Sequence, residues 1–509
     1  MTDGERQGAI EPIVDEGRNC WRIARADEAS VIVDAADYYR IISAAMCAAA
    51  KRIFIVGWDF DTRIALDPDE EGEGETLGQF FLRLAREKPE REIDILKWNF
   101  GALKQLFRPA ALIWLYRWWR TKSIDFRLDG SHPPGCSHHQ KIVVIDDALA
   151  ACGGIDISNR RWDTSNHEDD DPHRVEPNGD PYPPWHDATM LMRGSIAGAL
   201  AELGRERWKA ATHEKLDSLD QCECKWPDDL PVMFRNVDIA IARTRAAYDQ
   251  LEEVREVETL FLDMIAAAKR FIYFENQYFT SAKIGAAFAK RMAEANPPDI
   301  VLVMPRTADG WLEQKAMDAA RIKLVREIGK ADKTGRFRVY VPVTKGGTDI
   351  YVHAKVSIVD DRLLRVGSAN LNNRSQCLDS ECDVIIDAAL PSNHDTGPAM
   401  TALRHRLMAE HLGCEPAQVA AAEQAAGGSM IDAIEALRGP GKTLELLEME
   451  ELGDAEEFIA SNELLDPESP DEMFEPIHKR GLAQSWAHGR ALITNRLAQR
   501  RRTGKSDQG

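Results

Sequence analysis

The sequence predicts an α/β fold of two similar lobes, each a mixed, mostly parallel sheet flanked by helices, followed by a helical C-terminal extension. A repeated segment and a repeated order of short apolar strands predict this architecture. The run AAAKR occupies 48–52, before the apolar residues 53–58, and recurs at 266–270, before 271–274. The offset between the copies is 266 − 48 = 218 residues. A repeat at such an offset indicates a duplicated structural unit.

The repeat continues through each half of the chain. Short apolar runs that predict strands follow in the same order in both halves. They are Ile93–Trp98, Ile124–Leu128 and Ile142–Ile145 in the first half, and Ile300–Met304, Phe337–Val341 and Val356–Val359 in the second. The order strand, helix, strand, helix, strand, strand favours a mixed, largely parallel sheet in each lobe.

The sequence divides into three regions. Residues 1–215 are predicted to form the first lobe and residues 232–412 the second, and a polar stretch rich in Asp, Cys and Pro separates them. Residues 413–509 have no counterpart in the first half and are predicted to form an acidic helical extension or a partly disordered tail.

Charge and apolar content restrict the partners. The 509 residues carry a formal net charge of −20, so the protein would repel nucleic acid unless a local basic patch overrides the total. No apolar run is long enough to span a membrane, and residues 1–19 contain no signal peptide. Nine cysteines without regular spacing are interpreted as reduced thiols. We therefore expect a cytoplasmic monomer that meets lipid from the membrane surface, as a peripheral protein.

Two copies of the motif H-x-K-x4-D predict the chemistry. His139, Lys141 and Asp146 form the first copy. His353, Lys355 and Asp360 form the second copy, at an offset of 353 − 139 = 214 residues, close to that of AAAKR. One match is compatible with chance, whereas two matches at equivalent points of a repeat are hard to explain by chance.

The spacing places the reactive side chains together. Residues i and i+2 of an extended segment point to the same face, so each histidine projects with its lysine. A neutral imidazole can attack phosphorus and become a phosphohistidine, while a second, protonated histidine gives its proton to the leaving oxygen. The lysines Lys141 and Lys355 offer positive charge to the phosphate oxygens. Asp146 and Asp360 stand at strand ends, where we expect structural roles.

A glycine-containing turn follows each motif. In the second half, Ser368 and Asn370 come directly after Gly367, and we expect both side chains to bind phosphate. The first half has Asp156 at the corresponding place. Since aspartate is a poor phosphate ligand, we expect Asp156 to hold a neighbouring cation or a backbone amide. Asp187 and Glu381 are the candidates for orienting the two motif histidines, and spacing alone proves neither.

Other polar and aromatic residues leave alternatives open. His138, His167, His173 and His186 are expected to be structural. The acidic loop 167–173 suits either a divalent cation or, as we favour, solvent. The run 112–120, LIWLYRWWR, suits a membrane interface or a core helix with basic residues that extend outward. Tyr182, Trp185 and Tyr278 suit cation–π contact with a choline head group or, as we favour slightly, ordinary packing.

At these motifs the sequence resembles the phospholipase D superfamily, and the resemblance runs from about residue 20 to about residue 412. The segments that carry it, besides the two motifs, are GWDFD at 57–61, GGID at 153–156 with RRWD at 160–163, PWHD at 184–187, IYFENQYF at 272–279 and GSANLNNRS at 367–375. The flanking segments are similar to the phospholipase branch of the family.

The resemblance implies two pseudo-twofold-related lobes with one active site between them, and ping-pong chemistry with no cofactor and no obligatory metal. It implies that His139 attacks, that His353 protonates the leaving group, and that Asp187 and Glu381 orient them. It also implies a phosphatidyl substrate such as phosphatidylcholine, cleaved to phosphatidate and a free alcohol, with transphosphatidylation when another alcohol replaces water. Asp156 departs from the asparagine of many bacterial members, which puts the phosphate contacts of the first half in doubt.

Three other functions compete with this hypothesis. A cardiolipin-synthase-like phosphatidyltransferase predicts an N-terminal membrane anchor, which the sequence lacks. A nuclease of the same superfamily is commonly a short chain with one motif, unlike this chain of two motifs and net charge −20. A non-catalytic binding protein would not need both His-Lys pairs, which are intact here.

Overall fold

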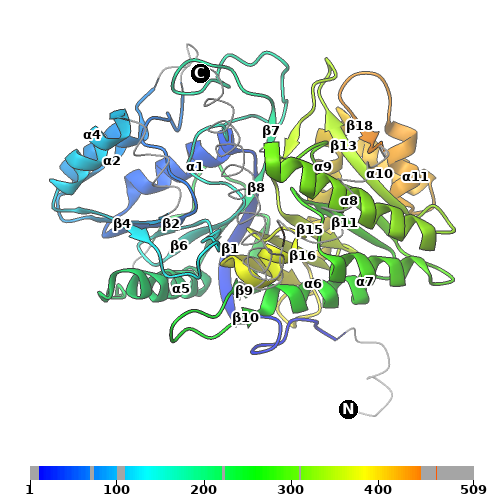
Figure 1. Cartoon of the computed structure of the whole chain (residues 1–509), viewed down its shortest axis with the longest axis horizontal. Helices are drawn as coiled ribbons and strands as arrows, with labels where there is room; N and C mark the ends of the chain where they lie inside the picture. The colour runs from blue at the N-terminus through cyan, green and yellow to red at the C-terminus, as the bar shows by residue number, and fades with distance from the viewer. Residues whose placement is uncertain are drawn as a thin grey trace, which may run out of the picture.

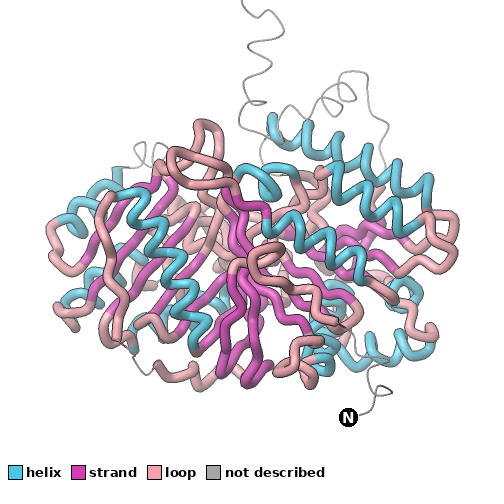
Figure 2. Tube along the Cα trace, turned by 90° about the horizontal axis from the view of Figure 1, so that it is seen from below, coloured by secondary structure: helices cyan, strands magenta, loops and turns pink. Residues whose placement is uncertain are grey.

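One mixed sheet of sixteen strands runs through both halves of the chain. The computed structural model describes residues 11–68, 74–99, 109–220, 224–308, 311–448 and Asp466. The strand order is β18-β13-β12-β11-β15-β16-β17-β9-β1-β8-β6-β5-β2-β3-β4, and β10 (Val254–Arg255) pairs with β9. Figure 2 shows the strands of both halves meeting at the centre of the molecule.

The two halves of this sheet repeat the same strand order. The first-half strands are β2 (Arg52–Gly57), β3 (Glu92–Trp98), β4 (Ile124–Asp129), β5 (Ile142–Ile145), β6 (Leu149–Gly153) and β8 (Ala188–Arg193). Their second-half counterparts are β11 (Phe271–Glu275), β12 (Asp299–Val303), β13 (Phe337–Val343), β15 (Val356–Val359), β16 (Leu363–Gly367) and β17 (Glu381–Asp387). Between them, β1 (Arg22–Val33) and β9 (Phe234–Arg245) pair antiparallel and join the halves.

The sheet is mixed, as predicted, but the expectation of mostly parallel strands is wrong. Parallel ladders join only β2–β3–β4 and β11–β12–β13 among the described strands of this sheet. The other ladders are antiparallel, including those of the hairpins β5–β6 and β15–β16. The sequence-based expectation rested on strands separated by helices and did not count the second strand of each hairpin. Strands joined by a short turn pair antiparallel.

Helices cover both halves of the sheet. They are α1 (Ala35–Ala48), α2 (Leu77–Glu87), α4 (Pro109–Trp119) and α5 (Ser195–Thr212) in the first half, and α6 (Glu256–Ala267), α7 (Ala282–Met292), α8 (Trp311–Ala331) and α9 (Gly397–Leu412) in the second. Figure 1 shows the first set with the first-half strands and the second set with the second-half strands.

One apolar core is shared by the two halves. Successive residues of a strand point to opposite faces of the sheet. Phe54 of β2 and Tyr273 of β11 belong to one continuous buried cluster, whereas Ile55 and Phe274 belong to clusters of their own halves. The halves therefore pack on each other through apolar side chains as well as through strands. The division at 216–231 stays a prediction.

Part of the C-terminal extension packs on the second half. It forms α10 (Pro416–Ala425), α11 (Met430–Leu437) and β18 (Thr443–Leu446). Strand β18 pairs antiparallel with β13 and so adds an edge strand to the sheet. Except for Asp466, the predicted acidic tail from residue 449 onward lies outside the described residues.

Helix α4 combines the two alternatives considered for its sequence. Trp118 is fully buried against the core of the first half. Ile113, Tyr116 and Trp119 are exposed, with Trp119 at 80% exposure. One face of α4 thus packs in the core while the other presents apolar and aromatic side chains. No helix of the described part of the chain is long and apolar enough to cross a membrane.

The aspartate of each motif binds the backbone at the end of the AAAKR segment in its own half. Asp146 accepts hydrogen bonds from the backbone N–H groups of Ala50, Lys51 and Arg52 at 2.6–2.8 Å. Asp360 accepts three in the same way, from residues 269–271 at 2.7–2.9 Å. AAAKR and the motif aspartate therefore recur together because each aspartate fixes the turn that leads into β2 or β11.

We predict that Asp146→Asn destabilises the protein without changing its chemistry. Asp146 has a φ of 54°, a left-handed conformation that asparagine tolerates. Loss of the charge on an acceptor of three N–H groups is expected to lower the free energy of unfolding by about 1–3 kcal/mol. Denaturant titration followed by circular dichroism measures this loss.

The matched control is Asp249→Asn, since Asp249 is exposed and has a φ of 51°. Equal stability of the two variants would show that the Asp146 hydrogen bonds do not stabilise the fold.

Candidate active site

The two motif histidines are each held by a carboxylate of the opposite half. His139 Nδ1 lies 3.1 Å from both Oε1 and Oε2 of Glu381. His353 Nδ1 lies 2.6 Å from Asp187 Oδ2. The first-half histidine thus depends on a second-half glutamate, and the second-half histidine on a first-half aspartate. Sequence reasoning named these four residues but not the crossed pairing.

Two parallel backbone pairings produce this crossing. β7 (Trp185–His186) and β14 (Tyr351–Val352) form a two-stranded parallel sheet, which places the next residues, Asp187 and His353, side by side. A parallel bridge between His138 and Ser380 does the same for the residues that follow them. The backbones of the two halves are therefore paired immediately before each histidine–carboxylate contact.

The crossed pairs leave the same ring nitrogen free in both histidines. Because Nδ1 of each ring contacts a carboxylate, Nε2 is available to a substrate, and within the described residues it has no hydrogen-bond partner in either ring. His139 retains 15% side-chain exposure and His353 6%, so both rings are largely buried but still reach solvent.

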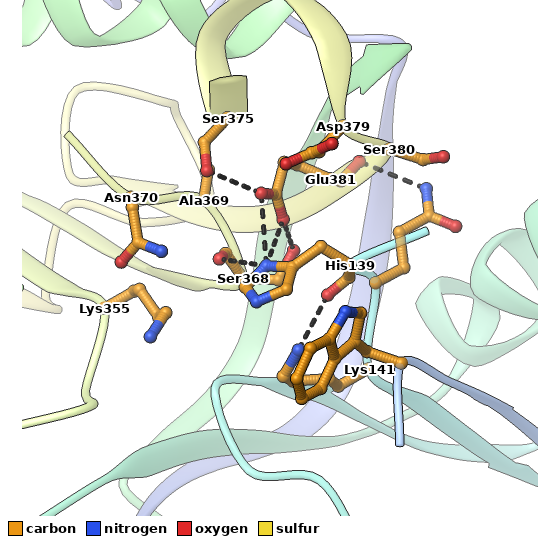
Figure 3. A network of polar contacts seen from close by, with 12 residues as sticks. His139, Lys141, Lys355, Ser368, Ala369, Asn370, Ser375, Asp379, Ser380 and Glu381 are labelled. Atoms are coloured by element: carbon orange, nitrogen blue, oxygen red, sulfur yellow. Dashed lines mark hydrogen bonds and ion pairs between the residues drawn. The ribbon is translucent and has the colours of Figure 1, made fainter. Parts of the chain in front are cut away.

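Glu381 is supported by two serine hydroxyls. Ser368 Oγ donates to Oε2 at 2.5 Å, and Ser375 Oγ donates to Oε1 at 2.7 Å. Figure 3 shows the carboxylate between these hydroxyls and the His139 ring. Burial raises the pKa of Glu381 to about 8, while hydrogen bonds from the serines and the charge of Lys141 act in the opposite direction. Ser375 belongs to a single π-helical turn, η1 (Arg374–Leu378).

Burial and positive neighbours keep both rings neutral. The pKa of His139 is lowered well below its ordinary value, first by burial and then by Lys141 and Lys355. The pKa of His353 is lowered in the same way, by burial and then by Lys355, Arg161, Lys141 and His139. The lysine of each half thus lowers the pKa of the histidine of the other half as well as its own.

The two lysines have different partners. Lys141 Nζ donates to the carbonyl of its own motif histidine at 2.9 Å and lies 3.1 Å from Asp156 Oδ2. Lys355 Nζ donates to Gln277 Oε1 at 3.2 Å and to the carbonyl of His353. Burial lowers the pKa of Lys355 to about 7. Figure 3 shows both lysines beside the His139 ring.

Asp156 and Asn370 occupy corresponding positions with different partners. Asp156 Oδ1 accepts N–H groups of Trp58 and Asp59, each at 3.2 Å, and Oδ2 faces Lys141. Asn370 is buried, and its Oδ1 has no hydrogen-bond partner among the described residues. Figure 3 shows the Asn370 amide next to Lys355. The expectation that Asn370 contacts phosphate stays a prediction.

Ser368 contacts His139 and Glu381 on the Nδ1 side of the His139 ring. Its carbonyl oxygen is 3.1 Å from His139 Nδ1, and its hydroxyl is engaged by Glu381. Both contacts lie on the side of the ring opposite the free Nε2. We therefore propose that Ser368 orients Glu381, in place of the phosphate contact predicted for it.

Sequence reasoning missed Gln277 and Arg161 as members of the site. Gln277 contacts Lys355, and Arg161 lies over the Trp185 ring at 4.2 Å from its centroid. Trp185 in turn contacts the His353 ring at a centroid distance of 5.1 Å. The signals were present, since these residues stand in the segments ENQYF, RRWD and PWHD.

Parts of the sequence are similar to known proteins. A family model described as "Cardiolipin synthase, PLD-like domain" matches residues 261–395, which include the second motif. Phospholipase D1 of Saccharomyces cerevisiae is 25% identical over 483 residues, covering 75% of this chain and 29% of that protein. Phospholipase D alpha 1 of Ricinus communis is 24% identical, covering 72% of this chain and 63% of that protein. The chain thus spans about a third to two thirds of the length of these relatives.

A solved structure shows the same fold. Phosphatidylserine synthase of Haemophilus influenzae superposes with a TM-score of 0.54 at 14% sequence identity, covering 77% of this chain and 88% of that chain. The duplicated motifs, the crossed site and the aligned relatives agree: the chain is similar to members of the phospholipase D superfamily.

Proposed function

We propose that the protein is a phosphodiesterase that cleaves a phosphatidyl lipid, such as phosphatidylcholine, to phosphatidate and a free alcohol at a membrane surface. The observation that carries this proposal is the pair of crossed contacts, His139 with Glu381 and His353 with Asp187. They prepare two imidazoles of one site with the same ring nitrogen free. Relatives named phospholipase D support the lipid substrate.

In the proposed first step, His139 Nε2 attacks phosphorus and forms a P–N bond while the P–O bond to the head group breaks. His353 gives its proton to the departing oxygen, so that the free alcohol leaves. In the second step, water attacks the phosphohistidine, His353 takes the water proton, and the P–N bond breaks to release phosphatidate. An alcohol in place of water gives transphosphatidylation.

The charge of the substrate sets the protonation of His139 and His353. The rings of His139 and His353 are neutral partly because the ammonium groups of Lys141 and Lys355 lie beside them. A phosphodiester anion between Lys141 and Lys355 offsets that charge, so it raises the proton affinity of His353 when substrate arrives. The lysines and the Asn370 amide then stabilise the negative charge that grows on the phosphate oxygens.

Contact with a lipid surface is supported by helix α4. Its exposed residues Ile113, Tyr116 and Trp119 stand beside Arg117 and Arg120. Aromatic, apolar and basic side chains together suit the boundary between head groups and acyl chains.

A cardiolipin-synthase-like phosphatidyltransferase is the second candidate, because the matching family model carries that description. It uses the same phosphohistidine with a lipid alcohol as acceptor. A nuclease is a third candidate, disfavoured by the net charge of −20.

The proposed function is tested with vesicles of different phosphatidyl head groups, with phosphatidylglycerol as acceptor, and with single-stranded DNA. We expect release of the free head-group alcohol from lipid, and loss of at least ~1000-fold in rate for His139→Ala, the scale of losing a nucleophile. Water as the acceptor supports the phosphodiesterase.

His132→Ala is the control, since His132 contacts Trp98 and Asn99 and not the crossed pairs. Cardiolipin as the main product would favour the transferase. Cleavage of DNA alone would overturn both lipid functions.

The support of Glu381 by Ser375 predicts a shift of the pH profile. The hydrogen bond from Ser375 favours the ionised carboxylate, so Ser375→Ala is expected to raise the pKa of Glu381 further above its ordinary value. His139 offers Nε2 to phosphorus only while Glu381 is ionised. The rising limb of kcat/KM between pH 5 and 10 should therefore move up by about one pH unit, the effect of one hydrogen bond.

Ser375→Thr keeps the hydroxyl and should leave the limb near its original position. An unchanged or lowered limb in Ser375→Ala would contradict the role given to Glu381.

A further inference from the structure

A second group of buried titratable residues joins the two halves beside the active site. It consists of Asp34, His167, His186 and Glu410, which we call the buried His–carboxylate cluster. Asp34 directly precedes α1, His186 is in β7, and Glu410 is in α9. The side chains are at most 4% exposed. None of the four belongs to the proposed phosphodiesterase chemistry.

Each histidine of the cluster is oriented by a carboxylate outside it. His167 Nδ1 lies 2.9 Å from Asp163 Oδ2, and His186 Nε2 lies 2.9 Å from Glu275 Oε2. The other nitrogen of each ring is thereby turned toward Asp34 and Glu410. A carboxylate that fixes the outer nitrogen of a ligating imidazole is the usual support of a metal-binding histidine.

The inner atoms are close enough to be ligands of one ion, since one candidate ligand atom from each of the four residues lies within 4.8 Å of the others. His186 Nδ1 is 3.2 Å from Asp34 Oδ1 and 2.8 Å from Glu410 Oε1. His167 Nε2 is 3.2 Å from Glu410 Oε1 and 3.9 Å from Asp34 Oδ2. Ligands about 2.0–2.1 Å from a tetrahedral Zn²⁺ ion stand about 3.3–3.4 Å apart.

Two of these buried atoms have no hydrogen bond. His186 Nδ1 lies close to two carboxylates, yet no contact has hydrogen-bond geometry, and Glu410 Oε2 also has no partner among the described residues. A buried polar atom without a partner is costly, and such atoms commonly mark an ion or water. The two carboxylates carry two negative charges, which one divalent cation neutralises while both imidazoles stay neutral.

We propose that the buried His–carboxylate cluster binds one divalent transition-metal ion, with Zn²⁺ as the best match to two imidazoles and two carboxylates. The ion ties Asp34, His167 and His186 of the first half to Glu410 of the second. It does not touch the reacting atoms. It positions the site, since His186 precedes Asp187, the partner of His353. This inference departs from the expectation of no metal and does not depend on the proposed substrate.

The test measures metal in the purified full-length protein. After treatment with a chelator and addition of Zn²⁺, mass spectrometry of the metal content is expected to give one Zn²⁺ per chain, with a higher midpoint of thermal unfolding. Co²⁺ in place of Zn²⁺ should give the visible absorption of a tetrahedral site. Glu410→Gln should lower Zn²⁺ affinity by more than ~10-fold, the scale for losing even an outer partner of a ligand.

His405→Gln is the matched control, because His405 lies on the same helix and pairs with Glu423 outside the cluster. It should keep one Zn²⁺ per chain. Folding of each variant is checked by circular dichroism, and the wild-type titration stands without any variant. If the wild type bound no metal and Zn²⁺ did not change its unfolding midpoint, the proposal would be overturned. Two protons would then neutralise the two carboxylates of the cluster. Equal loss of metal in both variants would also overturn it.

Discussion

The crossed contact between histidine and carboxylate is the constraint on which the site depends. Each half contributes one histidine and the carboxylate that orients the histidine of the other half. Neither half alone can therefore prepare its own imidazole. The strand pairing of β1 with β9, the shared apolar core and the bridges before each pair all hold the halves in the one relation that the site requires.

Burial changes the pKa values of the groups in this arrangement. The same desolvation that lowers the pKa of both histidines raises that of Glu381, and serine hydroxyls and lysines act against it. A neutral imidazole is the form that attacks phosphorus. In the proposed reaction, the charge of an anionic substrate offsets the two ammonium groups and so raises the proton affinity of His353.

Much of this could be predicted from the sequence, because duplication repeats both local structure and chemistry. The two H-x-K-x4-D motifs and AAAKR located β2, β5, β11 and β15, and Asp146 shows why the two signals recur together. The crossed pairing of histidines and carboxylates could not be predicted, since it depends on how the two halves pack against each other. The residue type of Ser368 predicts a phosphate contact, but residue type does not reveal which side of a ring a hydroxyl occupies. The cluster of Asp34 and Glu410 joins residues 376 positions apart (410 − 34), and no spacing rule connects them.

The most direct measurement of the central claim is the site of phosphorylation in substrate-trapped enzyme. Enzyme that has reacted with substrate is denatured rapidly at high pH, because the P–N bond is labile in acid, and is then digested and analysed by mass spectrometry. The measurement is made on the wild type and on His353→Ala. In this variant, loss of the proposed acid and base should slow breakdown of the intermediate. The account predicts one phosphatidyl group per chain, bonded through phosphorus to His139. Label on His353, or label on both histidines of one chain, would contradict two imidazoles acting in turn on a single phosphorus atom.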